Sequence, residues 1–290
     1  MVTIPDAERG PRLAVVSTVE RPGPTARVEV VEHVGDEGRR REDRVVAEEP
    51  LELRLAWPGT PAHRSWVTMR SPGHDFELAA GWVLHEGLTG RHGVSSVAYC
   101  TDEDLTPQQE FNVVTVTLAA APARAPGTRH AGHTTGSSAC GVCGKDSIEE
   151  ALAVFRGTPY AGPALEPDVV RSLPDLLRLH QRTFESTGGA HAAGLVDGSG
   201  SMLVVREDVG RHNAVDKVTG ARLLAGLDPG AAALVVSGRA GFELVQKAVA
   251  AGVGALVAVG APTSLSVSLA TQSGLALYGF TGRSRTVRYA

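Results

Sequence analysis

Apolar and polar residues alternate along the first third of the chain. Arg27 to Val34 and Arg44 to Ala56 both follow a period of two, which is typical of half-buried strands. Between them lie the turn-forming residues Gly35 to Gly38 and then a basic run, Arg39 to Arg41. This order predicts a hairpin with a charged, solvated tip.

The pattern changes to a helical period after Ser71-Pro72-Gly73. Apolar side chains recur three and four positions apart within Asp75 to His85, which predicts a helix with one buried face. We therefore expect a loose tail over 1–25 and a β-rich unit with one helix over 26–122. The other strands expected in this unit are Trp66 to Met69, Val94 to Cys100 and Phe111 to Leu118.

Residues 119–135 are rich in Ala, Pro, Gly, His and Thr and have no apolar period. We expect a mobile loop over 123–145, followed by a helix that begins at Ser147, where Glu150 completes a capping box. A second helix is expected near Pro174 to Phe184, with the proline in its first turn, ending before Gly188.

The remaining part of the chain predicts a layered α/β domain over 146–290. Ala231 to Val236 and Ala255 to Val259 are continuous apolar runs on either side of a helical segment, Gly241 to Ala251, which is typical of parallel strands buried on both faces. The other expected elements are strands at 192–196, 202–205, 275–280 and 286–289 and helices at 213–224 and 264–271.

Composition and charge narrow the classes of function. The chain has 290 residues and a net charge of −4, which disfavours a nucleic-acid binder. No apolar stretch is long enough for a membrane helix, and the first residues lack the apolar core of a secretory signal. Three cysteines, an odd and low number, argue against a disulfide framework and favour a reducing compartment.

The pair Cys140 and Cys143 allows three interpretations. A C-x-x-C pair near a helix N-terminus and beside Lys145 would have lowered thiol pKa values, which favours a reactive sulfur site. His130 and His133 precede the pair and would complete a four-ligand zinc set. The two thiols could also be incidental, and the residues alone leave these alternatives open.

Several turns in the last hundred residues carry candidate binding groups. His191 begins a strand and invites comparison with zinc deaminases, but Ala193 stands where their essential glutamate would lie. The turns at Arg239 and at Thr263 each follow a buried strand and open a helix, an arrangement that favours phosphate. Arginines beside a glycine turn could clamp a pyrophosphate, and the segment that offers them is Phe280, Thr281, Gly282, Arg283, Ser284 and Arg285.

A charged segment, Arg206 to Asn213, lies between a predicted strand and a predicted helix. Loops after strand ends line the ligand crevice of layered α/β domains. We therefore expect this segment to be a functional loop.

Together these segments resemble the formate dehydrogenase accessory sulfurtransferase family (FdhD). The matching stretches are SPGHDFELAAGWVLHEG from Ser71, CGVCG from Cys140, FESTGGAHAA from Phe184, REDVGRHNAVDK from Arg206, SGRAGFELVQKA from Ser237, VAVGAPTSLSV from Val257 and YGFTGRSR ending at Arg285. They run in order from about residue 65 to the end of the chain.

The resemblance implies a cytoplasmic sulfurtransferase with a cytidine deaminase-like larger domain. Such a protein takes sulfur from a cysteine desulfurase as a cysteine persulfide, here on Cys140 with Cys143 in support. It passes the sulfur to a molybdenum bis(guanine dinucleotide) cofactor, which is a bound substrate, before that cofactor enters formate dehydrogenase. The residues expected to contact the cofactor are His191, Arg239, Thr263 and those from Phe280 to Arg285.

The competing hypothesis is a zinc-stabilised chaperone that binds the cofactor without sulfur chemistry. On the first hypothesis we expect no permanently bound metal. We also expect a homodimer, and neither nucleic acid nor membrane as a partner.

Overall fold

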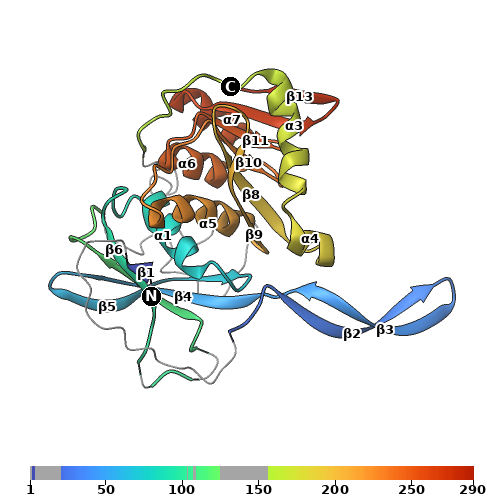
Figure 1. Ribbon diagram of the computed structural model, residues 1–290, viewed down its shortest axis with the longest axis horizontal. Coiled ribbons are helices and arrows are strands. Elements are labelled where there is room, and N and C mark those ends of the chain that lie inside the picture. Colours follow the sequence, from blue (N-terminus) through green and yellow to red (C-terminus); the bar gives the residue numbers. More distant parts are fainter. Residues whose placement is uncertain (1, 4–20, 103, 107–108, 125–155) are drawn as a thin grey trace.

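The computed structural model describes residues 2–3, 21–102, 104–106, 109–124 and 156–290. Within these ranges it contains six helices and three sheets (Figure 1). The mixed α/β class expected from the sequence is confirmed. The specific likeness to cytidine deaminases stays a prediction.

The N-terminal sheet has five strands in the order β1-β6-β7-β4-β5. One helix, α1, packs on it, and its position follows from the sequence period: Leu78, Ala79 and Val83 are fully buried against the sheet. The elements are β1 (Val2–Thr3), β4 (Glu49–Trp57), β5 (Thr60–Arg70), α1 (Asp75–His85), β6 (Val94–Tyr99) and β7 (Val113–Leu118).

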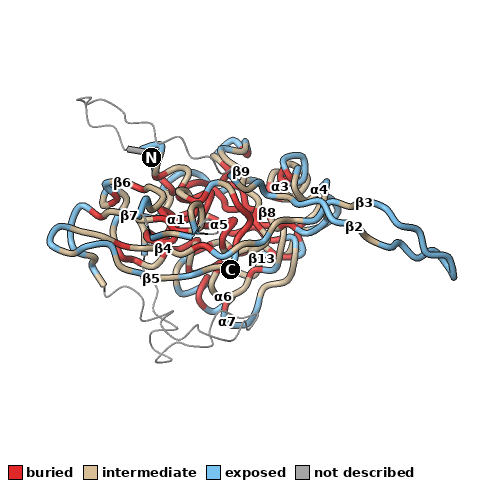
Figure 2. The backbone as a smooth tube through the Cα atoms, turned by 90° about the horizontal axis from the view of Figure 1, so that it is seen from below, coloured by how far each residue is buried: buried red, intermediate tan, exposed pale blue. Residues whose placement is uncertain are grey.

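A separate two-stranded ribbon precedes this sheet. It consists of β2 (Thr25–Val34) and β3 (Glu37–Val46), paired antiparallel along their whole length. The ribbon projects from the body of the molecule (Figure 1), and most of its side chains are exposed (Figure 2).

The C-terminal sheet has six strands in the order β13-β12-β11-β10-β8-β9. β10, β11 and β12 are parallel neighbours, and the other neighbouring pairs are antiparallel. Its elements are α3 (Pro167–Arg178), α4 (Arg182–Thr187), β8 (His191–Val196), β9 (Met202–Asp208), α5 (Arg211–Leu224), β10 (Ala233–Val236), α6 (Phe242–Ala251), β11 (Ala255–Ala258), α7 (Ser264–Ser273), β12 (Ala276–Gly282) and β13 (Arg285–Arg288).

The central strands are buried on both faces, as their continuous apolar runs predicted. Leu234 and Val236 of β10 pack toward α5, α6 and α7. Ala233 and Val235 of the same strand pack toward α3. Successive strand residues point to opposite faces, so the sheet forms the middle of three layers.

The two sheets are joined through a close crossing of α1 and α5. A Cβ atom added at Gly81 of α1 would lie 2.0 Å from the carbonyl oxygen of Asp216, and one added at Gly220 of α5 would lie 1.7 Å from that of Glu77. Both distances are far below any real contact. The helices therefore touch backbone to backbone, and only glycine fits at these two positions.

Buried charges surround this crossing. Lys217 of α5 contacts Asp208 at 2.7 Å and donates to the carbonyl oxygen of Ser71 at 2.9 Å. On the other side, Nδ1 of His85 donates to Asp216 at 2.5 Å, and Nζ of Lys247 contacts the same carboxylate at 2.7 Å. An unpaired charge would be costly to bury between the two sheets, but each of these charges has a partner of opposite sign. We call this region around the helix crossing the seam.

Five expectations from the sequence are wrong. Arg44 to Ala56 do not form one strand but are divided between β3, which ends at Val46, and β4, which begins at Glu49. Pro174 does not begin a helix but lies inside α3, whose first residue is Pro167. Arg39 to Arg41 lie within β3 rather than at the hairpin tip, because the turn closes at residues 35–36. Arg206 to Asp208 complete β9 instead of forming a loop. Residues 2–3 of the expected loose tail pair with β6.

Among the described helices, none combines the length and the apolar character needed to cross a bilayer.

The glycine crossing generates a first prediction. Gly220→Ala should lower the free energy of unfolding by about 2–4 kcal/mol, because the methyl group must push the two helices apart. Gly90→Ala, at an exposed site with no atom near the added carbon, should change it by less than about 0.5 kcal/mol. Urea unfolding of both variants measures the difference, and equal midpoints would contradict the close contact.

A second prediction concerns acid stability. Burial alone would raise the pKa of Glu77, but hydrogen bonds from Arg206 and His74 outweigh burial and lower it from 4.5 to about 2. A carboxyl group with a lowered pKa stabilises the fold above its unfolded pKa and loses that contribution as the pH falls. The loss should amount to roughly 2–3 kcal/mol between about pH 5 and pH 2.

The measurement is the unfolding free energy against pH for the wild type and Glu77→Gln. The variant should be less stable at neutral pH, and the gap should close as the pH falls. Asp36→Asn at the exposed hairpin turn serves as the control and should keep the wild-type profile. A constant gap between the wild type and Glu77→Gln would show that this carboxylate is not the group responsible.

Candidate functional site: the carboxyl edge of the C-terminal sheet

Parallel strands bring the predicted turns together at one edge of the C-terminal sheet. The turn with Arg239 follows β10, the turn with Thr263 follows β11, and Phe280 to Arg285 span the end of β12 and the start of β13. His191 begins β8 at the same edge, because β8 runs antiparallel to β10 and its Ala193 pairs with Val236.

Backbone hydrogen bonds tie these turns into one unit. The amide of Gly260 donates to the carbonyl of Gly238 at 2.9 Å, and the amide of Phe280 donates to the carbonyl of Gly260 at 3.1 Å. The amide of Ala240 donates to Ala261 at 3.1 Å. Gly260 is required here, since a Cβ atom would lie 2.9 Å from Cγ of Arg239. These bonds fix the turns that follow β10, β11 and β12 relative to one another. We call this edge, with the turns at Arg239 and Thr263 and the segment from Phe280 to Arg285, the platform.

The two helix N-termini at this edge differ in how they are capped. Thr263 is the N-cap of α7, and its hydroxyl accepts from the amide of Ser266 in a capping box. Gly241 is the N-cap of α6 and offers no side-chain cap. The first turn of α6 thus has amide groups that no side chain caps, which favours an anion, but it also carries the carboxylate of Glu243.

Phe280 has a backbone conformation that is rare for an aromatic residue. Its φ is 49°, in the left-handed region, which costs a bulky side chain about 1–2 kcal/mol. The residue is 42% exposed, and the guanidinium of Arg285 lies over its ring, 5.1 Å from the centroid. The strain holds an aromatic face open to solvent at the platform.

The neighbouring residues of this segment have different surroundings. Thr281 is buried, and its hydroxyl shares a hydrogen bond of 2.9 Å with that of Thr286. Arg283 is exposed and forms an ion pair with Asp175 of α3, which raises the pKa of the guanidinium. Gly282 pairs with Arg285 across the hairpin, and Ser284 lies in its turn.

His191 lies half-buried beside the turn after β10. A Cβ atom at Gly238 would be 3.6 Å from the imidazole ring and 3.9 Å from Cδ of Arg211. Burial is the main cause that lowers the pKa of His191, and the positive charges of Arg211 and His212 lower it further. Burial and these neighbouring charges therefore disfavour the protonated ring at this edge.

Sequence reasoning overlooked part of this edge. Nε2 of His212, at the start of α5, lies 2.9 Å from a carboxylate oxygen of Glu243 in the first turn of α6. The charged motif from Arg206 to Asn213 signalled the region. The motif could not predict that the partner of His212 is Glu243, on a helix about thirty residues further along the chain.

Cys140 and Cys143, together with His130 and His133, lie outside the described residues. In the part of the chain that the structure describes, no group of three or more His, Cys, Asp or Glu side chains could hold a metal ion.

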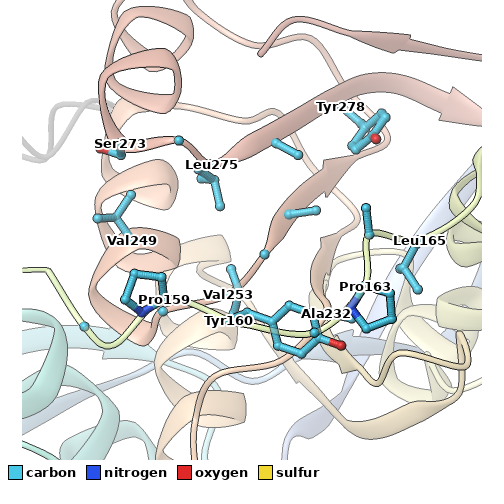
Figure 3. Close-up of a pocket in the computed structure, with 18 of the residues that line it drawn as sticks. Pro159, Tyr160, Pro163, Leu165, Ala232, Val249, Val253, Ser273, Leu275 and Tyr278 are labelled. Atoms are coloured by element: carbon cyan, nitrogen blue, oxygen red, sulfur yellow. The ribbon is translucent and has the colours of Figure 1, made fainter.

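A cavity of about 200 Å³ lies at the opposite edge of the same sheet. Its walls come from residues 156–165 and from the ends of α6 and α7, with Tyr160, Pro163, Val253, Leu275 and Tyr278 among its lining (Figure 3). The two helices approach it with their C-termini, whose partial charge is negative. The lining is mixed and includes Arg156 and Ser273, but no N-terminus of a described helix of the C-terminal domain points into it.

A model of the FdhD/NarQ family matches residues 46–290. The chain belongs to the FdhD/NarQ family. The ribbon formed by β2 and β3 lies almost entirely before the matched range, whereas the platform and every strand of the two large sheets except β1 lie within it.

Two curated relatives are both called sulfur carrier protein FdhD. The protein from Mycolicibacterium paratuberculosis is 46% identical over 259 residues, covering 88% of this chain and 93% of its own length. The protein from Streptomyces avermitilis is 47% identical over 244 residues, covering 83% and 84%.

A solved structure shares the fold. It is a formate dehydrogenase accessory protein from Desulfotalea psychrophila, which superposes with a TM-score of 0.71 over 92% of this chain and 97% of its own at 22% identity.

The strained aromatic generates a third prediction. Phe280→Gly should leave the free energy of unfolding unchanged or raise it by up to about 1 kcal/mol, because glycine adopts a positive φ without strain. Tyr278→Gly on the same strand removes a ring that packs against the core, and it should cost about 2 kcal/mol or more. Urea unfolding measures the free energy of unfolding of both variants. An equal decrease in the two would show that the ring of Phe280 stabilises the fold as the ring of Tyr278 does.

Proposed function

We propose that this protein carries sulfur as a cysteine persulfide to a molybdenum bis(guanine dinucleotide) cofactor that is destined for formate dehydrogenase. The observation that carries the proposal is the platform: arginines, an uncapped helix N-terminus and an exposed aromatic ring meet at one rigid edge. These are the groups that a phosphate-linked guanine nucleotide would contact. The names of the relatives support the sulfur-carrying part of the proposal.

The sulfur step needs one reactive thiolate. The thiolate of Cys140 attacks the terminal sulfur of a persulfide on a cysteine desulfurase. The S–S bond in the desulfurase breaks, a new S–S bond forms on Cys140, and the desulfurase cysteine leaves as a thiolate. Transfer onward breaks the new bond, and attack by Cys143 on Cys140 would release the sulfur as sulfide and leave a disulfide that a cellular thiol reduces.

The platform would bind the cofactor through its nucleotide arms. Arg239, which precedes α6, and Arg285, which lies over Phe280, offer charge-assisted hydrogen bonds to phosphate. The ring of Phe280 offers a stacking face for a purine. His191 flanks the same edge and offers a hydrogen-bonding ring. Thr263 lies at this edge too, but its amide already donates to the hydroxyl of Ser266 and its hydroxyl accepts from the amide of Ser266, so it would act mainly by fixing the turn. Arg283 could join only by leaving Asp175.

The partners follow from this role. A cysteine desulfurase would supply the sulfur, and a formate dehydrogenase would receive the finished cofactor. Both reactions belong to the cytoplasm, where thiols stay reduced.

The test of the sulfur step is mass spectrometry after incubation with a cysteine desulfurase and cysteine. The wild type should gain about 32 Da, one sulfur, on the peptide that contains residues 140–143. Cys140→Ala should lose this adduct, Cys143→Ala should keep it, and Cys100→Ala should behave as wild type. An unmodified wild-type peptide would refute the sulfur carrier.

The test of the platform is calorimetric titration with guanosine diphosphate. Arg239→Gln should weaken binding at least tenfold, in line with the loss of one charge-assisted contact. Arg171→Gln, a partly exposed arginine on α3 paired with Asp168, is the control and should bind as wild type. No binding to the wild type would remove the cofactor half of the proposal.

A zinc measurement separates the competing hypothesis. One bound zinc per chain, whose removal by a chelator unfolds the protein, would favour a zinc-stabilised chaperone. A folded, zinc-free protein that accepts sulfur would favour the carrier.

A further inference from the structure

Three buried side chains from three helices meet at the seam. Nδ1 of His85 on α1 donates to Asp216 on α5 at 2.5 Å, and Nζ of Lys247 on α6 lies 2.7 Å and 2.9 Å from the two oxygens of the same carboxylate. The three side chains are 1%, 12% and 0% exposed for His85, Lys247 and Asp216. One carboxylate therefore ties the helix of the N-terminal sheet to two helices of the C-terminal sheet.

The imidazole ring of His85 is hydrogen-bonded on one side. Nδ1 carries the proton, because an ionised carboxylate can only accept. No described residue offers a hydrogen bond to Nε2, which is buried. In this form the three side chains hold one positive and one negative charge, so the buried cluster is neutral.

A second proton on the ring would break this balance. Two cations, His85 and Lys247, would share one carboxylate, and the new N–H group at Nε2 would be buried without an acceptor among the described residues. Burial is the main cause that lowers the pKa of His85. Asp216 acts in the opposite direction, Lys247 lowers the pKa further, and Glu86, the next residue in the chain, raises it. The closed seam therefore binds the second proton poorly.

The two C-terminal helices are also tied to each other without His85. His212 and Glu243 pair across the first turns of α5 and α6 at 2.9 Å. Asp216 and Lys247 follow four residues later on the same helices, one turn further along. Loss of the His85 contact would therefore free the end of α1 while α5 and α6 stay joined.

The other end of α1 has its own tie to the C-terminal sheet. Glu77, in the first turn of α1, accepts two hydrogen bonds from Arg206 of β9 at 2.5 Å and 2.7 Å. This pair does not involve His85. Release at His85 would therefore be confined to the last turns of α1, from Gly81 to His85.

We propose that the contact between His85 and Asp216 is an acid-operated latch: protonation of the ring releases the C-terminal turns of α1 from α5 and leaves the two sheets otherwise folded. This inference is independent of the proposed function, because it rests on the seam alone.

Proton linkage gives the direction of the effect. In the released state the ring is in water and titrates near its ordinary value of 6.5, whereas the latched ring has a lowered pKa. Between these two values, release takes up one proton, so the ratio of released to latched molecules should rise about tenfold for each unit by which the pH falls. The latch is therefore closed at neutral pH and is lost as the pH falls below about 6.5.

Hydrogen–deuterium exchange followed by mass spectrometry tests the latch. After correction for the intrinsic pH dependence of exchange, the peptide with residues 80–87 should exchange about tenfold faster at about pH 5.5 than at about pH 6.5. A peptide from β10, residues 232–237, should change by less than about twofold. Equal acceleration of the two peptides would indicate global unfolding and would overturn the proposal.

His85→Asn separates the proton from the hydrogen bond. The asparagine amide can donate to Asp216 from nearly the position of Nδ1, but it takes up no proton in this range. The acceleration of residues 80–87 should therefore fall to less than about twofold. His92→Asn changes an exposed histidine and serves as the matched control, which should accelerate as the wild type does. Acceleration that survives in His85→Asn would contradict the latch.

Lys247→Met tests the charge argument from the other side. Without the ammonium group, a protonated ring is the one cation beside Asp216, so the latch should hold at about pH 5.5 although His85 is charged. Nitrogen-15 NMR should show a proton on Nδ1 alone in the wild type at about pH 6 and on both ring nitrogens in the variant. A wild-type ring that is already doubly protonated at this pH would refute the proposal. Should Lys247→Met fail to fold, the exchange of His85→Asn decides by itself.

Discussion

The backbone contact between α1 and α5 is the constraint on which the rest of the structure depends. Gly81 and Gly220 allow the two helices to approach until any side chain would collide with a carbonyl oxygen. Each helix is also covered by its own sheet, so the two cores meet through this pair. Because interiors are densely packed and yield little, a shift at the crossing would reach both sheets.

The same seam positions part of the candidate site. Asp208 ends β9, where it accepts from the amide of Ser71 at 3.2 Å and pairs with buried Lys217. Three residues later α5 begins with Arg211, which lies beside His191 at the platform. Removing one partner of a buried ion pair is strongly destabilising. The residues that join the sheets therefore also hold the first turn of α5 at the platform.

Local patterns predicted the elements whose neighbours lie close in sequence. The helical period predicted both ends of α1 correctly, at Asp75 and His85. The continuous apolar runs predicted that β10 and β11 are parallel strands. The prediction that a helix begins at Pro174 is wrong. Proline has no amide hydrogen to donate inside a helix, but the packing of Val170, Leu173 and Leu177 against the sheet stabilises α3 through this position. The charged residues 206–208 suggested a loop, because the residues that pair with them in the fold, Glu77 and Lys217, are not next to them in the sequence.

The direction of the strands decides which chemistry each edge of the C-terminal sheet can support. The parallel order of β10, β11 and β12 sends the N-termini of α6 and α7 to one edge and their C-termini to the other. The first edge gathers helix N-termini and arginines, whereas the second borders a cavity with a mixed lining and receives the helix C-termini. Helix dipoles act only over the terminal turn, so an anion gains at one edge alone. The family assignment rests on residue identity, but this polarity follows from topology and would survive most substitutions of surface charge.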